Sequence, residues 1–294
     1  MKFGVSMFTT DQSAGPAEVA RAVEERGFES FWVSEHSHIP VHEAPPFPGF
    51  EPRMYAAMLD PFVALAAAAT VTQRIRLGTA ISLVIQRDPI NCAKAVASVD
   101  HLSNGRMLFG IGAGWNEGEM RNHGTDPSTR FRLMRERVRA MQALWTQEQA
   151  EFHGEAHDFD AVWQWPKPVQ KPHPPVLVAG SGPGVLRRVV AYGDGWMPVV
   201  VPEIADEMRG RVTSMAEFVE LVPRLRSMAT DAGRPPPSIS VSGALLDQQN
   251  YDAFAQLEVE RLQLRLTPAP LPDVLRELDT HREAVLAVGA GLDA

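Results

Sequence analysis

The chain contains little that would place it outside the class of ordinary globular proteins. Its 294 residues include one cysteine, Cys92, so no disulfide can form within the chain. Cys92 lies in an apolar stretch, which predicts a buried and unreactive thiol. No apolar run reaches the roughly 20 residues that a membrane-spanning helix needs.

Clusters of basic residues are also absent, and acidic residues outnumber basic ones by 36 to 28. The formal net charge is −8, and no Lys/Arg-rich run is present, so neither nucleic acid nor an acidic membrane surface is an expected partner. The first residues lack a basic region followed by an apolar one, so we expect no signal peptide. These absences predict a cytoplasmic protein.

What the chain does contain is a regular alternation of apolar strand patterns and helix signals. Asp60-Pro61 and Asp88-Pro89 each combine an N-cap with a first-turn proline. The strand patterns are mostly continuous apolar runs, which is typical of strands covered on both faces. Eight are predicted: 3–8, 28–34, 75–83, 107–113, 175–179, 196–201, 239–246 and 261–266.

Eight such units in a chain of this length predict an α/β fold, a single (β/α)8 TIM barrel spanning 1–294. A doubly wound open sheet is the alternative. Two proline-rich insertions, about 36–59 and 147–174, interrupt the rhythm and predict lid loops at the C-terminal mouth. Their aromatic residues suggest an apolar or ring-shaped substrate: Phe47, Phe50, Trp163 and Trp165.

In a barrel of this type the active site lies where the strands end. AGSGPG, residues 179–184, joins a strand to a helix whose first turn contains Pro183. Glycines allow a close approach to a ligand, and the free N–H groups of a helix start attract an anion, so this loop predicts phosphate binding. A tight turn without a ligand is the alternative. The pattern is neither a Rossmann fingerprint nor a P-loop.

A second glycine-rich strand end is GIGAGW, residues 110–115. The alternating glycines Gly110, Gly112 and Gly114 leave one side of the strand without side chains. A flat ligand could lie there, or the glycines could serve close packing inside the barrel. The sequence leaves both interpretations open.

Glu35 and His36 end the second strand. They could form a structural pair, or Glu35 could accept a hydrogen bond from a ligand while His36 exchanges a proton with the substrate. His36, His38 and His42 also resemble the His-x-His of metal-dependent barrel hydrolases, but such a site needs ligands from other strand ends, where acidic residues are scarce. We therefore expect no metal. A nucleophilic serine is disfavoured, since no Gly-x-Ser-x-Gly elbow is present.

Several segments together resemble the luciferase-like monooxygenase superfamily, and within it the oxidoreductases that depend on the deazaflavin F420. They are WVSEH (32–36), IRLGTAIS (75–82), LSNGRMLFGIGAGW (102–115), PPVLVAGSGP (174–183) and GDGW (193–196). The motifs occur in the family's order and cover roughly residues 1–200. The C-terminal third is similar to one F420-type subgroup.

The resemblance implies a barrel that binds a flavin-shaped ring at its mouth, with F420 as the cofactor and FMN as the alternative. His36 would be the catalytic residue near the substrate. A bulge with a non-prolyl cis peptide, here Ala80–Ile81, would support the ring. The implied cofactor-binding residues are Glu35, Ala80, Ile81, Ser82, Ala113, Gly114, Ala179, Gly180, Ser181 and Gly182.

The resemblance also has two departures. Members that oxidise sugar phosphates carry a glutamate after the strand-four glycines that acts with the histidine, and Trp115 stands there in this chain. Luciferase relatives carry an arginine near this strand end that holds the FMN phosphate, where this chain has Ala113-Gly114.

We therefore expect an enzyme in which the usual acid–base pair is missing and F420 is favoured over FMN. The expected activity is hydride transfer between the deazaflavin and a small organic substrate. An FMN-dependent monooxygenase and a non-catalytic flavin or deazaflavin carrier are the alternatives. Since relatives are often dimers, a homodimer is expected.

Overall fold

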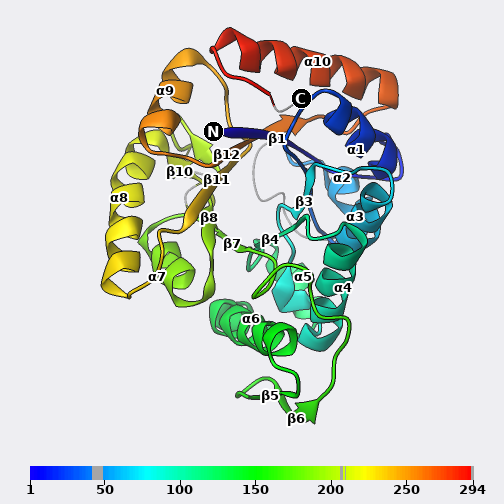
Figure 1. Ribbon diagram of the computed structural model, residues 1–294, viewed down its shortest axis with the longest axis vertical. Coiled ribbons are helices and arrows are strands. Elements are labelled where there is room, and N and C mark those ends of the chain that lie inside the picture. Colours follow the sequence, from blue (N-terminus) through cyan, green and yellow to red (C-terminus); the bar gives the residue numbers. More distant parts are fainter. Residues whose placement is uncertain (42–48, 206–207, 209, 293–294) are drawn as a thin grey trace.

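The computed structural model describes residues 1–41, 49–205, 208 and 210–292. Eight parallel strands close into a barrel in the order β1-β12-β11-β8-β7-β4-β3-β2, and helices surround it (Figure 1). The predicted (β/α)8 barrel is confirmed, and the doubly wound open sheet is excluded because β1 pairs with both β2 and β12. Among the described helices, none is both long and apolar enough to cross a lipid bilayer.

The barrel strands lie close to their predicted positions. They are β1 (Lys2–Met7), β2 (Ser30–Val33), β3 (Arg76–Thr79), β4 (Met107–Ile111), β7 (Val176–Ala179), β8 (Gly195–Met197), β11 (Ser238–Ser242) and β12 (Arg261–Leu266). The longer helices are α1 (Pro16–Glu25), α3 (Pro61–Ala69), α4 (Pro89–Leu102), α6 (Arg130–Thr146), α7 (Pro183–Tyr192), α8 (Met215–Asp231), α9 (Gln248–Gln256) and α10 (Leu271–Ala287). Two short helices, α2 (Pro52–Ala56) and α5 (Glu117–Asn122), follow β2 and β4.

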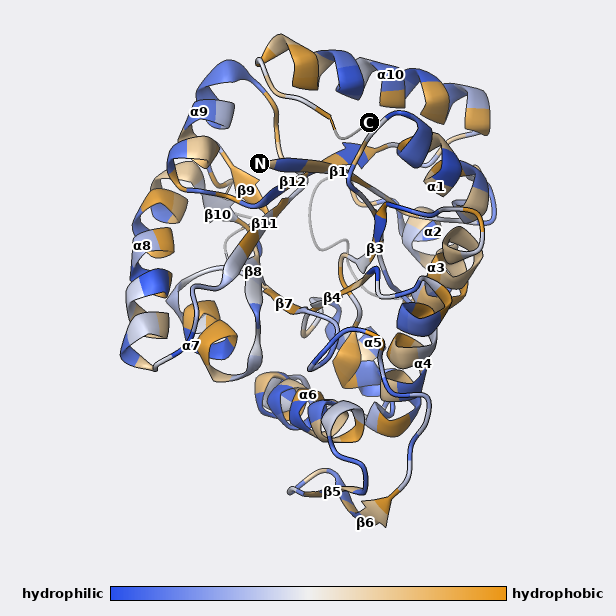
Figure 2. Ribbon diagram, viewed as in Figure 1, coloured by the Kyte–Doolittle hydropathy of each residue, from blue (hydrophilic) through white to orange (hydrophobic). Residues whose placement is uncertain are grey.

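The apolar residues divide between two cores. The larger lies between the strands and the helices, whose apolar stripes alternate with polar ones in Figure 2. It contains Cys92, whose burial raises the pKa of its thiol to about 12, so the prediction of a buried, unreactive cysteine is confirmed.

The smaller core fills the barrel itself. It consists of Trp32, Leu108, Leu177 and Met197. Gly78 makes room for it, since a Cβ there would lie 2.1 Å from the Trp32 ring. The barrel is therefore a packed core and not a pore.

Three predicted strands run four residues beyond the observed ends, and one of them, 239–246, stops at Ser242. The third ends at Thr79 instead of Leu83, because the cis peptide Ala80–Ile81 interrupts the ladder before Ser82 forms a single bridge to Ile111. The sixth ends at Met197, and Val200–Val201 forms a separate strand, β9, which pairs with β10 (Thr213–Ser214).

The segment 147–174 contains an antiparallel hairpin of β5 (Ala150–His153) and β6 (Asp158–Val162). It lies beyond α6 on the outside of the helix layer in Figure 1. Glu136 of α6 accepts hydrogen bonds from the backbone of Ala156 and His157, and Gln164 donates to Ile90 of α4. These contacts attach the segment to helices α4 and α6, and its predicted role as a lid stays a prediction.

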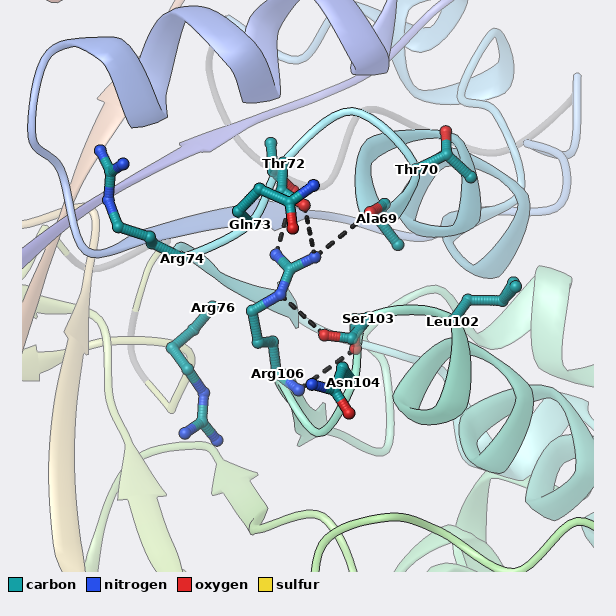
Figure 3. A pocket seen from close by; sticks show the side chains of 10 residues that line it. All are labelled: Ala69, Thr70, Thr72, Gln73, Arg74, Arg76, Leu102, Ser103, Asn104 and Arg106. Atoms are coloured by element: carbon teal, nitrogen blue, oxygen red, sulfur yellow. Dashed lines mark hydrogen bonds between the residues drawn. The ribbon is translucent and has the colours of Figure 1, made fainter.

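At the N-terminal end of the barrel, Arg106 joins neighbouring loops. Arg106 donates hydrogen bonds to four backbone carbonyls and to Thr72 Oγ1, and Figure 3 shows its side chain reaching toward Ala69 and Thr72. It borders a pocket of about 530 Å³ between the α3–β3 and α4–β4 loops. Because backbone oxygens accept the hydrogen bonds of the Arg106 guanidinium, we assign this arginine a role in stabilising the fold.

Candidate active site

Glu35 lies two residues beyond β2 and fixes the chain that follows β3. Its Oε2 accepts hydrogen bonds from Ser82 Oγ and Leu83 N, both at 2.8 Å, and its Oε1 accepts one from Arg87 Nε at 2.6 Å. Glu35 is buried, and Arg87 also reaches Asp60, the N-cap of α3. The carboxylate therefore joins three barrel segments. The hydrogen bond from a cofactor to Glu35 stays a prediction. Oε1 has a second lone pair that could accept it.

His36 is paired with a glutamate that the sequence did not reveal. Its Nδ1 lies 2.7 Å from Oε2 of Glu119 on α5, and the two side chains are only 6% and 1% exposed. Burial alone would raise the pKa of Glu119, but hydrogen bonds from His36 and Ser37 outweigh it and hold this pKa below its ordinary value. The expectation that Trp115 leaves the histidine without a glutamate partner is therefore wrong.

Aromatic side chains surround the His36 ring. The ring centroids of Tyr55 and Trp115 lie 5.5 and 5.3 Å from it, both edge-on. Phe50 packs against both of these rings, at 4.8 and 5.5 Å. Phe50 and Tyr55 belong to the predicted lid 36–59, and this part of it does lie against the candidate catalytic histidine. Phe47 falls outside the described residues.

The bulge after β3 forms a platform on the barrel core. The structure contains the non-prolyl cis peptide Ala80–Ile81 that the resemblance implied. Ala80, Ile81 and Ala179 are partly exposed and pack on the interior core described above. Small and aliphatic side chains on a packed base suit the face of a flat ring, so the predicted residues of β3 and β7 do come together.

The strand-four glycines serve packing. A Cβ on Gly112 would lie 2.0 Å from Ile81 Cδ1, and one on Gly110 would lie 2.0 Å from the Thr79 carbonyl oxygen. Of the two interpretations left open by the sequence, close packing holds for both residues, because they allow the β3 bulge to lie against β4. Ala113 is buried, and Gly114, with φ of +68°, turns the chain toward Trp115.

The loop after β7 has the features of an anion site. Gly182 is the N-cap of the ten-residue helix α7, and no side chain caps that helix. The hydroxyl oxygen of Ser181 is buried without a hydrogen-bond partner, which is costly unless a ligand supplies one. A pocket of about 630 Å³, lined by Ser181, Gly182 and residues of 202–217, adjoins the loop. These residues fit a cofactor with a phosphate group.

Comparison with known proteins places this site in a family. The model of the luciferase-like monooxygenase family matches residues 1–246. An uncharacterized protein of Mycobacterium tuberculosis, Rv0953c, is 45% identical over 203 residues, which is 67% of this chain and 72% of that protein.

Two further comparisons bear on cofactor and fold. An F420-dependent glucose-6-phosphate dehydrogenase of Kineococcus radiotolerans is 32% identical over 188 residues, 62% of this chain and 51% of that protein. The crystal structure of the monooxygenase RslO1 from Streptomyces bottropensis superposes with a TM-score of 0.76 at 23% identity, covering 99% of this chain and 100% of that chain. It supports the fold alone. The resemblance found in the sequence is thus confirmed, and the chain belongs to the luciferase-like monooxygenase family.

Proposed function

We propose that the protein is an F420-dependent oxidoreductase that transfers a hydride between the deazaflavin and a small organic substrate. The observation that carries the proposal is the His36–Glu119 pair, which lies at the same barrel mouth as the bulge platform and the loop around Ser181. Family membership supports an oxidoreductase that uses a flavin or deazaflavin. The relative from Kineococcus supports F420 as the choice.

When bound, the deazaflavin supplies or accepts the hydride, and the protein contributes binding, orientation and proton transfer. Ala80, Ile81 and Ala179 would support the ring, and Ser181 with its neighbouring N–H groups would hold the phosphate. Glu35 would keep the platform in place through Ser82 and Leu83.

The residue that exchanges the proton would be His36. Glu119 occupies its Nδ1, which leaves Nε2 to give a proton to a substrate oxygen during reduction, or to take one during oxidation. The aromatic rings of Tyr55 and Trp115 favour an apolar substrate beside this nitrogen. The assignment of His36 is the same for either direction of hydride transfer. It also does not depend on the predicted homodimer.

An FMN-dependent monooxygenase is the second candidate, since the chain belongs to the luciferase-like monooxygenase family. Parallel titrations with F420 and FMN, followed by fluorescence, separate the two. We expect saturable F420 binding and weak or absent FMN binding, since Ala113-Gly114 replaces the phosphate-holding arginine of luciferase relatives. Tight FMN binding without F420 binding would overturn the proposal.

A non-catalytic carrier is tested with His36→Ala. If the protein is an enzyme, this variant should turn over about 10²–10⁴-fold more slowly than the wild type and bind the cofactor with the same affinity. The matched control is His153→Ala, which removes an exposed histidine on the outer hairpin. Equal behaviour of the two variants would favour the carrier.

A further inference from the structure

Next to the candidate active site lies a second cluster of histidines that the proposed reaction does not use. His38, Glu119 and His123 each offer a ligand atom, and these atoms all lie within 4.8 Å of one another. His38 follows β2, whereas Glu119 and His123 stand four residues apart on α5 and its C-cap, a spacing that places both on one face. His123 is exposed and Glu119 is buried, so the cluster extends from solvent to the His36 partner.

The donor atoms converge on one point, the hydroxyl of Ser37. Ser37 Oγ lies 2.8 Å from His38 Nδ1, 2.7 Å from His123 Nε2 and 3.2 Å from Glu119 Oε1. The hydroxyl therefore holds two imidazoles and a carboxylate in a preassembled arrangement.

Two imidazoles and one carboxylate are a donor set that zinc uses, with bonds of about 2.0–2.2 Å and a fourth position for water. Tetrahedral ligands at these bond lengths are about 3.4 Å apart, so donor atoms up to 4.8 Å apart need to close by up to about 1.4 Å. Rotation of the exposed His123 and of Ser37 can provide this movement.

Neighbouring groups already orient the ligands. Asn122 Nδ2 lies 2.9 Å from His38 Nε2, and the Ser37 backbone N–H donates to Glu119 Oε1 at 2.8 Å. The other carboxylate oxygen, Oε2, faces His36. When His38 binds a metal through Nδ1, its Nε2 carries the hydrogen, and Asn122 Oδ1 can accept a hydrogen bond from Nε2–H once the amide is turned. Such partners typically fix the ligands of a metal site.

We propose that His38, Glu119 and His123 form a binding site for a zinc-like divalent cation, which displaces the Ser37 hydroxyl from their centre. This is not the His-x-His arrangement considered from the sequence. His36 directs Nδ1 to Glu119, and His42 lies outside the described residues. The acidic ligand that the sequence seemed to lack at neighbouring strand ends is Glu119.

One consequence of this cation site, an effect of zinc on turnover, rests on the proposed function. A cation on Oε1 draws negative charge from the same carboxylate that faces His36. A less negative Glu119 would assist proton exchange at His36 less well. Zinc should therefore slow turnover, and a chelator should restore it.

The experiment is calorimetric titration of chelator-treated full-length protein with zinc chloride, without cofactor, alongside visible absorption with cobalt. We expect one zinc per chain and a tetrahedral cobalt spectrum. His38→Ala and His123→Ala should each weaken zinc binding by more than about tenfold, since even loss of an outer partner costs 10- to 100-fold. His153→Ala, an exposed histidine outside the cluster, should bind like the wild type.

Absence of saturable binding to the wild type, or wild-type affinity in either cluster variant, would overturn the proposal. Because no cofactor is present, this result is independent of the F420 titration. Either proposal can therefore fail while the other stands.

Discussion

Two carboxylates that are largely removed from solvent lie at opposite ends of the barrel and have different partners. At the N-terminal end, Glu29 accepts two hydrogen bonds from the guanidinium of Arg261, at 2.6 and 2.5 Å. At the C-terminal mouth, Glu119 accepts one from His36 at 2.7 Å. Both pairs are removed from solvent, with all four side chains at most 12% exposed.

The difference lies in what the partner can do with its proton. Arginine stays protonated under all ordinary conditions, so the Glu29–Arg261 pair can only hold the structure. Histidine gains and loses a proton near neutral pH, so the Glu119–His36 pair can take part in chemistry. The comparison predicts that changes at the N-terminal end affect stability, whereas changes at the mouth affect ligand binding and turnover.

The largest effect is expected for Arg261→Ala. It leaves the largely buried Glu29 without its ion-pair partner and removes the bond to Ser240 Oγ. Loss of one member of such a pair should lower the free energy of unfolding by about 3–5 kcal/mol. Urea denaturation measures this, with the exposed pair variant Arg121→Ala as a control expected to change it by less than about 1 kcal/mol. Equal stability of the two variants would contradict the assignment.

A smaller effect is expected from acid. Burial alone would raise the pKa of Glu29, but its bonds to Arg261 outweigh burial and lower this pKa. A lowered folded-state pKa gives stability that is complete above the unfolded value and is lost as the pH falls through the folded one. Below about pH 4.5, Glu29→Gln should therefore lose stability less steeply than the wild type. Unfolding free energies measured across acidic pH test this, and parallel curves would count against it.

The smallest effect is expected at the mouth, for Ser181→Ala. Its buried hydroxyl has no partner in the described part of the chain, so its removal should not lower the unfolding free energy. If it binds the cofactor phosphate, F420 affinity should fall by about 2- to 10-fold, the worth of one hydrogen bond. Titration of both proteins with F420 decides this, and unchanged affinity would remove Ser181 from the site.

Much of the fold could be predicted from the sequence because it depends on local signals. Asp60-Pro61 and Asp88-Pro89 do begin α3 and α4, and the Ser214–Glu217 capping box opens α8. Continuous apolar runs marked the eight barrel strands. The third was predicted too long, since no local pattern marks where the β3 bulge interrupts the ladder.

The partners of the site residues were harder to predict, since they depend on contacts between distant segments. Asn116 caps α5 by accepting from the backbone of Glu119, and an Asn followed three residues later by Glu is an ordinary helix-start signal. That signal gave no reason to look for Glu119 beside His36. In the same way, nothing near Glu35 showed that Arg87 and Ser82 would bind it.

The most direct test of the central claim, that Glu119 and His36 act together in proton exchange, is the turnover of Glu119→Gln at saturating F420. Glutamine keeps the shape of Glu119 but removes its negative charge beside His36. We predict a fall in kcat of about 100-fold or more, with unchanged F420 affinity. Wild-type turnover in this variant would contradict it.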